Sequence, residues 1–231
     1  MKLSRILSNQ NGVSRRHARH LLAAGEVQVD GTTCHDGSRE VSRFQQVCVG
    51  STIVQQAAPA YYLMLHKPAG YLSATVDNQH PTVLELLPAS LRPHLHIGGR
   101  LDRATTGLLI LSSDGRWSRQ LTLPGTKIPK TYKVTTALPI TPEVRQRFQE
   151  GIWFAFEQLS TSPAELDILG THEARITIYE GRYHQVKRMF HAVGNCVTSL
   201  HRESMGCLKL DPTLEPGCYR HLRPEEVSSV G

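Results

Sequence analysis

One stretch of the sequence, residues 98–111, brings a single carboxylate into a loop bounded by glycines. The apolar run 108–111 predicts a buried strand, and Asp102 precedes that strand by a few residues. Arg100 and Arg103 flank the carboxylate, so we expect it to stay ionised and to be available as a nucleophile or base. Taken alone, the four residues 100–103 are more typical of a surface turn in which the aspartate pairs with a neighbouring arginine. The longer pattern of the loop and the strand favours the catalytic interpretation.

A second segment, residues 183–193, combines an apolar helical stripe with a cluster of cations. The stripe predicts a helix that packs on the core through Val186, Met189, Phe190 and Val193. The remaining faces carry His184, Lys187, Arg188 and His191. From this segment alone, a solvent-exposed basic face is as good an interpretation as a functional one.

Four segments, in this order along the chain, resemble the motifs of the RNA pseudouridine synthases. They are residues 66–70, 99–107, 130–132 and 180–189. The resemblance covers essentially the whole chain and is closest to the branch that modifies ribosomal RNA of the small subunit. It implies an isomerase that needs no cofactor and converts one uridine of 16S ribosomal RNA, the uridine 516 site, to pseudouridine. The implied partner is ribosomal RNA or a partly assembled particle.

The resemblance also implies roles for individual residues. Asp102 would act on the target nucleotide, Lys187 would pair with it, and Tyr132 would pack against the base. Arg100 would fill the space that the extruded base leaves, and Leu200 would line the pocket floor. Lys130 and Arg182 would contact the substrate near its phosphates, and no residue is assigned to a metal. Without the resemblance, Tyr132 and Leu200 would be ordinary sheet and core residues.

The first 31 residues predict a small separate module. Leu3, Ile6 and Leu7 have helical spacing, Ser14 is a suitable N-cap for a second helix, and a hairpin turn follows at residues 30–31. The pattern resembles the S4-type RNA-binding domain of a ribosomal protein. The expected RNA-binding residues are Lys2, Arg5, Ser14, Arg15, Arg16 and Arg19. The simpler interpretation is that these cations only keep a helix soluble.

Charge and composition restrict the class of protein. The chain of 231 residues carries a formal charge of +6, and its first 25 residues contain five Lys or Arg and no acidic residue. Such a balance favours a polyanionic partner, because bound phosphates release counterions. No run approaches the roughly 18 apolar residues of a membrane helix, so we expect a cytoplasmic protein. The five cysteines form no Cys-x-x-Cys pair and predict free thiols rather than a zinc site.

From these patterns we predict an α+β fold in two domains. We predict an S4-like domain at residues 1–56, a linker at 57–60, and a catalytic domain at 61–231 with a mixed, largely antiparallel sheet and flanking helices. The chain is expected to be a monomer. The predicted strands of the second domain are Tyr61 to Leu65, Leu108 to Leu111, Tyr132 to Thr136, Ala174 to Tyr179 and Cys207 to Leu210, and the predicted helices are Thr141 to Gly151 and Tyr183 to Val193.

Three alternatives remain open at this stage. The first is a synthase that acts on a uridine of 23S ribosomal RNA. The second is a ribosome-assembly factor without catalytic activity, which would not need the Asp102 loop. The third is a glycosidic hydrolase, which normally needs a pair of carboxylates; Asp114 and Glu180 are the nearby candidates for the second acid.

Overall fold

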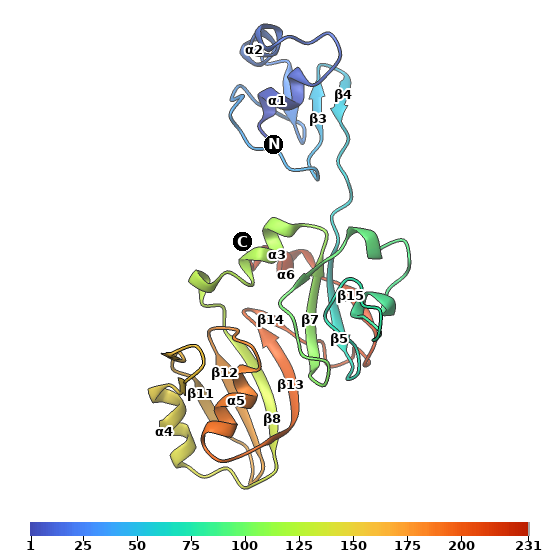
Figure 1. Cartoon of the computed structure of the whole chain (residues 1–231). Helices are drawn as coiled ribbons and strands as arrows, with labels where there is room; N and C mark the ends of the chain where they lie inside the picture. Colours follow the sequence, from blue (N-terminus) through green and yellow to red (C-terminus); the bar gives the residue numbers. More distant parts are fainter. Residues whose placement is uncertain (231) are drawn as a thin grey trace. The chain divides into compact units, whose positions relative to one another are not determined.

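The protein forms two compact units, one comprising Met1–Ala60 and one that begins at Tyr61. The computed structural model describes residues 1–230, and Figure 1 traces both units along the chain. The division falls at the end of the segment predicted to be a linker. Within residues 1–230, no helix combines the length and apolar character needed to cross a membrane.

The amino-terminal unit packs two helices against a small antiparallel sheet of order β2-β1-β3-β4. Its second helix begins where predicted, because the Ser14 side chain accepts a hydrogen bond from the backbone N–H of His17 at 3.1 Å. Asp30 and Gly31 both adopt positive φ, as a tight two-residue hairpin turn requires. The elements are α1 (Leu3–Ser8), α2 (Arg15–Ala23), β1 (Val27–Val29), β2 (Thr32–Thr33), β3 (Val47–Val49) and β4 (Thr52–Gln55).

The larger unit is built around a nine-stranded mixed sheet. Its strands are β5 (Tyr62–Lys67), β6 (His96–Gly98), β7 (Thr106–Ser112), β8 (Lys130–Thr136), β11 (Glu165–Ile168), β12 (Glu173–Ile178), β13 (Val197–Met205), β14 (Leu208–Lys209) and β15 (Tyr219–His221), with a separate pair, β9 (Trp153–Phe154) and β10 (Leu159–Ser160). The α-helices are α3 (Gly115–Gln120), α4 (Glu143–Glu150), α5 (Gln185–Ala192) and α6 (Pro224–Ser228), and short 3-10 turns are η1 (Val83–Leu86), η2 (Arg92–His94) and η3 (Pro124–Thr126).

The order of the main sheet is β11-β12-β8-β13-β7-β5-β15, and its central junction is the parallel pair β13–β7. The other pairings of this sheet are antiparallel, which confirms the predicted α+β class. The junction consists of two residue pairs, His201 with Thr106 and Arg202 with Gly107. In Figure 1, β7 and β13 run side by side between the two halves of the sheet. The Asp102 loop enters β7 at this junction.

Both faces of the central strands are buried. Leu109 and Leu111 of β7 belong to the core that α5 covers with Met189 and Phe190. Leu108 and Ile110, which point to the other face, pack in a second core with Trp117 and Leu222. A strand buried on both faces explains why residues 108–111 are apolar without alternation.

The structure corrects the start of two predicted helices and adds one strand that the sequence did not predict. Helix α4 begins at Glu143 and its capping position is Pro142, because backbone i to i+3 bonds to Thr141 and Pro142 close its first turn without a side-chain cap. Helix α5 begins at Gln185 rather than Tyr183, because His184 adopts the left-handed conformation with φ +50°. Strand β13 was not predicted as a strand, since polar side chains interrupt its apolar pattern.

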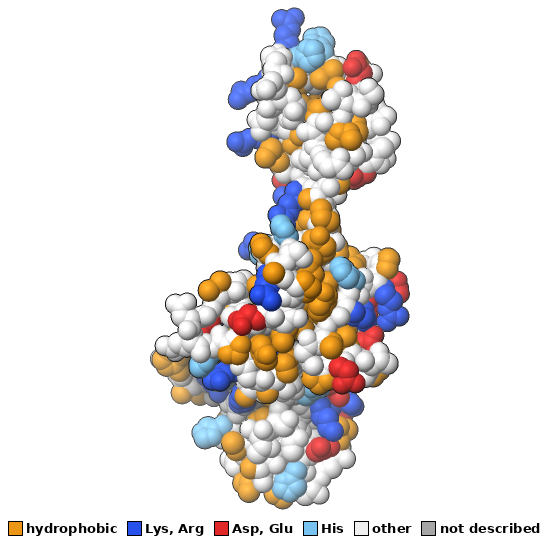
Figure 2. Space-filling model, turned by 90° about the vertical axis from the view of Figure 1, so that its right-hand side faces the viewer, with side chains coloured by type: hydrophobic (Ala, Val, Ile, Leu, Met, Phe, Trp, Pro, Cys, Tyr) orange, Lys and Arg blue, Asp and Glu red, His pale blue; other side chains and the backbone are white. Residues whose placement is uncertain are grey.

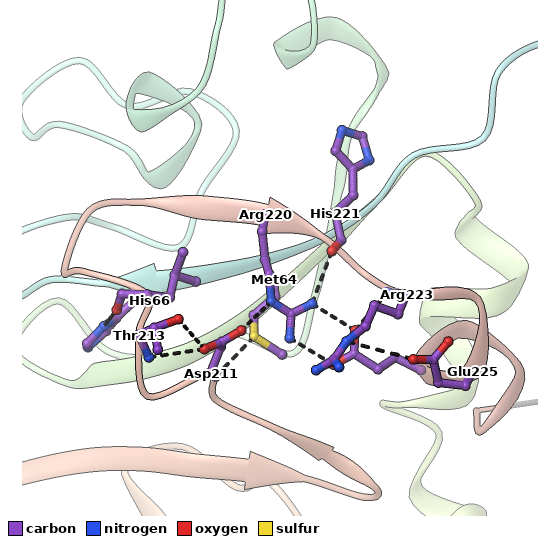
Figure 3. A network of polar contacts seen from close by, with 10 residues as sticks. Met64, His66, Asp211, Thr213, Arg220, His221, Arg223 and Glu225 are labelled. Atoms are coloured by element: carbon purple, nitrogen blue, oxygen red, sulfur yellow. Dashed lines mark hydrogen bonds and ion pairs between the residues drawn. The ribbon is translucent and has the colours of Figure 1, made fainter.

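The carboxyl-terminal segment is fastened to the sheet through Arg220 of β15 (Figure 3). Its guanidinium donates to Asp211 Oδ2, to both carboxylate oxygens of Glu226 and to the carbonyl of His221, at 2.8–3.0 Å. Hydrogen bonds from Thr213 and from Arg220 lower the pKa of Asp211 to about 2. The bonds from Arg220 lower the pKa of Glu226 to about 2. This arginine therefore links three successive parts of the terminal segment.

We predict that Arg220→Gln lowers the melting temperature at pH 7 by a few degrees and that this difference shrinks in acid. Both carboxyl groups have lower pKa values in the folded state than when unfolded. Their contribution is therefore complete above about pH 4.5 and is lost as the pH falls towards 2. Thermal unfolding of both proteins between pH 2.5 and 7 measures this difference in melting temperature. Arg223→Gln is the control, because that side chain is 63% exposed and 3.7 Å or more from its partners. An unchanged difference at pH 3 would contradict this account.

Candidate active site

A pocket of about 900 Å³ opens in the larger unit, and Asp102 lies in its wall. The loop before β7 supplies one side of this pocket, and the segment that leads from β12 into α5 supplies another. Tyr132 of β8, with Leu200 and Arg202 of β13, comes from the neighbouring strands. The pocket therefore lies where the two halves of the sheet meet.

The loop that carries Asp102 is held from beneath by a buried lysine. Lys67 of β5 is fully buried, and its Nζ donates to the carbonyls of Pro68, Arg103 and Thr105 at 2.8–3.2 Å. Burial lowers the pKa of Lys67 to about 8, while the nearby charge of Asp102 acts in the opposite direction. Two of the three carbonyls belong to the Asp102 loop.

Further bonds fix both ends of the same loop. The Ser73 hydroxyl both donates to the Leu101 carbonyl and accepts from the Leu101 N–H, at 2.8 and 3.0 Å. The Thr105 N–H donates to the Asp102 carbonyl at 3.0 Å. A loop bonded at so many backbone positions presents its carboxylate in one defined place.

Arg202 fastens the junction between the loop and the sheet. This arginine is 1% exposed, and its guanidinium donates to the carbonyls of Leu108 and Gly99 at 2.8 and 3.0 Å. Gly107 lies opposite it with φ +104°, and a Cβ on Gly107 would lie 2.3 Å from the Arg202 carbonyl oxygen. Only glycine fits at this crossing.

Two basic side chains, a lysine and a histidine, meet the Asp102 carboxylate. Lys187 Nζ is 3.3 Å from Oδ2, and His184 Nε2 is 3.4 Å from Oδ1. The predicted pairing of Asp102 with Lys187 is therefore present in the structure. Lys187 lies on α5 outside the pocket lining, whereas His184 lines the pocket just before the helix begins. The left-handed backbone at His184 separates it from the helical register.

The arginines that flank Asp102 in sequence do not pair with it. Arg103 is exposed and its Nε donates to the Gly70 carbonyl at 3.1 Å. Arg100 is exposed in the pocket wall. The contacts to the carboxylate come instead from Lys187, the partner that the resemblance implies, and from His184, because the loop turns the carboxylate towards α5.

Tyr132, Leu200 and Lys130 come together in the same pocket, as the predicted site requires. Tyr132 and Leu200 are buried, at 7% and 8% exposed, and both also belong to the core. Lys130 is partly buried, its Nζ donates to the Ile128 carbonyl, and burial followed by the charge of Arg202 lowers its pKa. An aromatic face and a cation therefore lie in the pocket that contains Asp102.

Glu180 and Arg182 hold the segment before α5 rather than offering a second free acid. Glu180 accepts from the Ser162 N–H, from Gln185 Nε2 and from Arg182 Nε, at 2.8–3.1 Å. Asp114, the other candidate acid, caps α3 by accepting from two backbone N–H groups. This arrangement disfavours a hydrolase that uses paired carboxylates.

The cations of the amino-terminal unit are available to solvent. Arg15, Arg16 and Arg19 of α2 and Lys2 and Arg5 near α1 are exposed, whereas the Ser14 hydroxyl is used as the helix cap. Lys and Arg side chains stand out along one side of this unit in Figure 2. The five cysteines are free, and within residues 1–230 no three His, Cys, Asp or Glu side chains are placed to hold a metal ion.

Sequence reasoning missed four residues of this site: Lys67, Thr105, His184 and Arg202. His184 and Lys67 lie within noted motifs, but a one-dimensional pattern does not reveal which face a side chain takes. Arg202 belongs to a strand that the apolar pattern failed to identify. For Lys67 and Arg202, the one available signal is a cationic residue inside a segment that forms a buried strand. Lys and Arg are almost never fully buried unless their donors are paired.

Comparison with known proteins identifies the family of both units. Residues 61–192 match the family model described as RNA pseudouridylate synthase, and residues 1–47 match the S4 domain. A relative from Pseudomonas aeruginosa, "Ribosomal small subunit pseudouridine synthase A", is 52% identical, with 100% of both chains covered. The relative of the same name from Escherichia coli K12 is 42% identical over 231 residues, again with full coverage of both. A solved structure, "Crystal structure of pseudouridylate synthase", aligns over 100% of both chains with a TM-score of 0.73 and 35% identity.

The fold and the domain composition are those of an RNA-modifying isomerase with an attached S4 domain. The chain belongs to the RNA pseudouridylate synthase family. The predicted family and fold class are therefore confirmed.

We predict that Lys67→Met destabilises the protein by about 1–3 kcal/mol, because buried carbonyls lose their donor. Its synthase activity should fall as well, since two of those carbonyls hold the Asp102 loop. Chemical denaturation and a pseudouridine assay measure both effects. Lys133→Met is the matched control, because Lys133 forms a surface pair with Glu173 and is 44% exposed. Equal stability and equal activity of the two variants would contradict the proposal that Lys67 holds the Asp102 loop.

Proposed function

We propose that this protein converts one uridine of small-subunit ribosomal RNA to pseudouridine, with Asp102 as the catalytic carboxylate. The observation that carries the proposal is a loop-held carboxylate, 3.3 Å from Lys187 and 3.4 Å from His184, in the wall of a pocket lined by Tyr132. The printed names of the full-length relatives support the small subunit as the source of the RNA. The uridine 516 site, the monomeric state and the cytoplasmic location remain predictions.

The reaction requires one bond exchange and one proton transfer. The bond between uracil N1 and ribose C1′ breaks, the base rotates, and a bond between C5 and C1′ forms. C5 then loses its proton and N1 gains one, so that the product is an isomer of the substrate. No water or redox equivalent is consumed. An ionised carboxylate can begin this sequence by attacking C1′ or by removing a ribose proton, and Lys187 Nζ lies 3.3 Å from the Asp102 carboxylate.

The walls of the pocket suit a base that has left the RNA stack. Extruding a uridine costs a few kcal/mol, which contacts in the pocket must offset. In our proposal the ring of Tyr132 packs against the uracil and Leu200 forms the floor. Arg100, exposed at the rim, occupies the space that the base leaves, and Lys130 and Arg182 lie on the phosphate side.

We predict that the wild-type protein creates one pseudouridine in small-subunit RNA and that Asp102→Asn creates none. The amide keeps the shape of the side chain but is neither a nucleophile nor a base. Transcripts of both ribosomal RNAs and partly assembled particles are incubated with each protein, and carbodiimide-dependent primer-extension stops locate the product. Asp167→Asn is the matched control, because Asp167 is an exposed aspartate of β11 outside the pocket lining.

The alternatives correspond to distinct results of that experiment. A primer-extension stop only in large-subunit RNA would mean that the substrate is large-subunit RNA. RNA binding without any new stop would favour an assembly factor. Full activity of Asp102→Asn would remove the aspartate from the mechanism.

We predict that the combined change Arg15→Gln, Arg16→Gln and Arg19→Gln weakens RNA binding and flattens its salt dependence. Each lost phosphate contact reduces the slope of log K against log salt by about 0.7–0.9, so the loss of three contacts reduces it by about 2–3. Filter binding from 50 to 300 mM salt measures it. Arg147→Gln with Lys209→Gln is the comparison, because both side chains are exposed on the larger unit and outside the pocket lining. An unaltered slope in the triple variant would mean that α2 does not contact phosphates.

A further inference from the structure

The hydroxyl of Thr105 is buried and has no hydrogen-bond partner. Thr105 is 1% exposed, and its Oγ1 stands alone in this respect among the buried side-chain N and O atoms of residues 1–230. Its backbone is fully used, because the N–H donates to the Asp102 carbonyl and the carbonyl accepts from Lys67. The missing bond is therefore confined to the side chain.

The neighbouring threonine gives a direct comparison. Thr106 Oγ1 lies 2.9 Å from His201 Nδ1, so its hydroxyl is satisfied within the protein. Two successive threonines thus stand at the end of the loop and the start of β7, but only one of their hydroxyls has an internal partner. A buried unpaired hydroxyl is unfavourable, and valine would fill the same volume without that cost.

The position of Thr105 indicates where its partner comes from. It lines the pocket three residues after Asp102, and the bonds of its own backbone fix its place in the loop. Thr105 is therefore a pocket-lining residue whose buried hydroxyl has no bond to the protein, and a ligand in the pocket can supply the complementary group. Uridine offers carbonyl oxygens, an N–H and ribose hydroxyls, each of which a hydroxyl can bond.

We propose that Thr105 is a substrate-binding residue whose Oγ1 forms a hydrogen bond with the target uridine once that nucleotide enters the pocket. This inference rests on the proposed function, because it takes the uridine as the ligand of the Asp102 pocket. Thr105 then serves two purposes in the loop. Its backbone helps to hold Asp102, and its side chain orients the nucleotide next to it.

The test compares Thr105→Val, Thr105→Ser and Thr106→Val by single-turnover kinetics on small-subunit RNA and by thermal unfolding. We expect Thr105→Val to lower the rate constant divided by K½ about tenfold to a hundredfold, while its melting temperature stays equal or rises. Thr105→Ser keeps the hydroxyl and should retain most of the activity. Thr106→Val should show the opposite pattern, with a lower melting temperature and activity within about threefold of wild type.

The outcomes separate this inference from the proposed function. If the wild type forms pseudouridine and Thr105→Val is equally fast, Thr105 does not bind substrate and the proposed function stands. A loss of activity in Thr105→Val that is matched by a fall in melting temperature would assign the residue a structural role and overturn the inference. If the wild type forms no pseudouridine, titration with uridine monophosphate remains decisive. Weaker binding by Thr105→Val would support the contact, and equal binding would overturn it.

Discussion

A charged lysine enclosed in the protein interior is the constraint on which the site depends. The three hydrogen bonds of Lys67 all go to backbone carbonyls, and two of these belong to the Asp102 loop. A buried ammonium group is costly unless its donors are satisfied, so the loop conformation and the buried charge stabilise each other. Arg202 of β13 is a second buried cation that holds backbone, because its guanidinium donates to the carbonyls of Leu108 and Gly99. The loop is thereby attached to the sheet by bonds that water cannot easily replace.

This arrangement separates the support of the carboxylate from its chemistry. Lys67 and Arg202 hold backbone, whereas Lys187 and His184 approach the Asp102 side chain from a different element, at the start of α5. Two halves of the sheet meet between these groups at a parallel junction of two residue pairs, and Gly107 permits the close approach of its strands. The pocket lies at this junction because neither half alone contains both the carboxylate and the side chains that contact it.

Much of this organisation follows from the sequence, and the exceptions have physical reasons. The apolar stripe of α5 and the apolar run of β7 are periodic signals, and they locate the elements that position Lys187 and Asp102. Strand β13 is missed because His201 and Arg202 interrupt its pattern with polar groups whose partners, Thr106 and two backbone carbonyls, are distant in sequence. Local charge also misleads, since Arg100 and Arg103 adjoin Asp102 in the chain while the structure turns its carboxylate towards α5. The orphaned hydroxyl of Thr105 is visible only when every contact is known.

The central claim is that the Asp102 loop is held in place before RNA binds. Amide hydrogen exchange in the RNA-free protein tests it most directly, at the N–H groups of Leu101 and Thr105, which are bonded to Ser73 and to the Asp102 carbonyl. The account predicts that both amides exchange slowly, on the timescale of the buried strand residue Leu109. Exchange as fast as that of an unstructured peptide, with protection only after RNA is added, would contradict it.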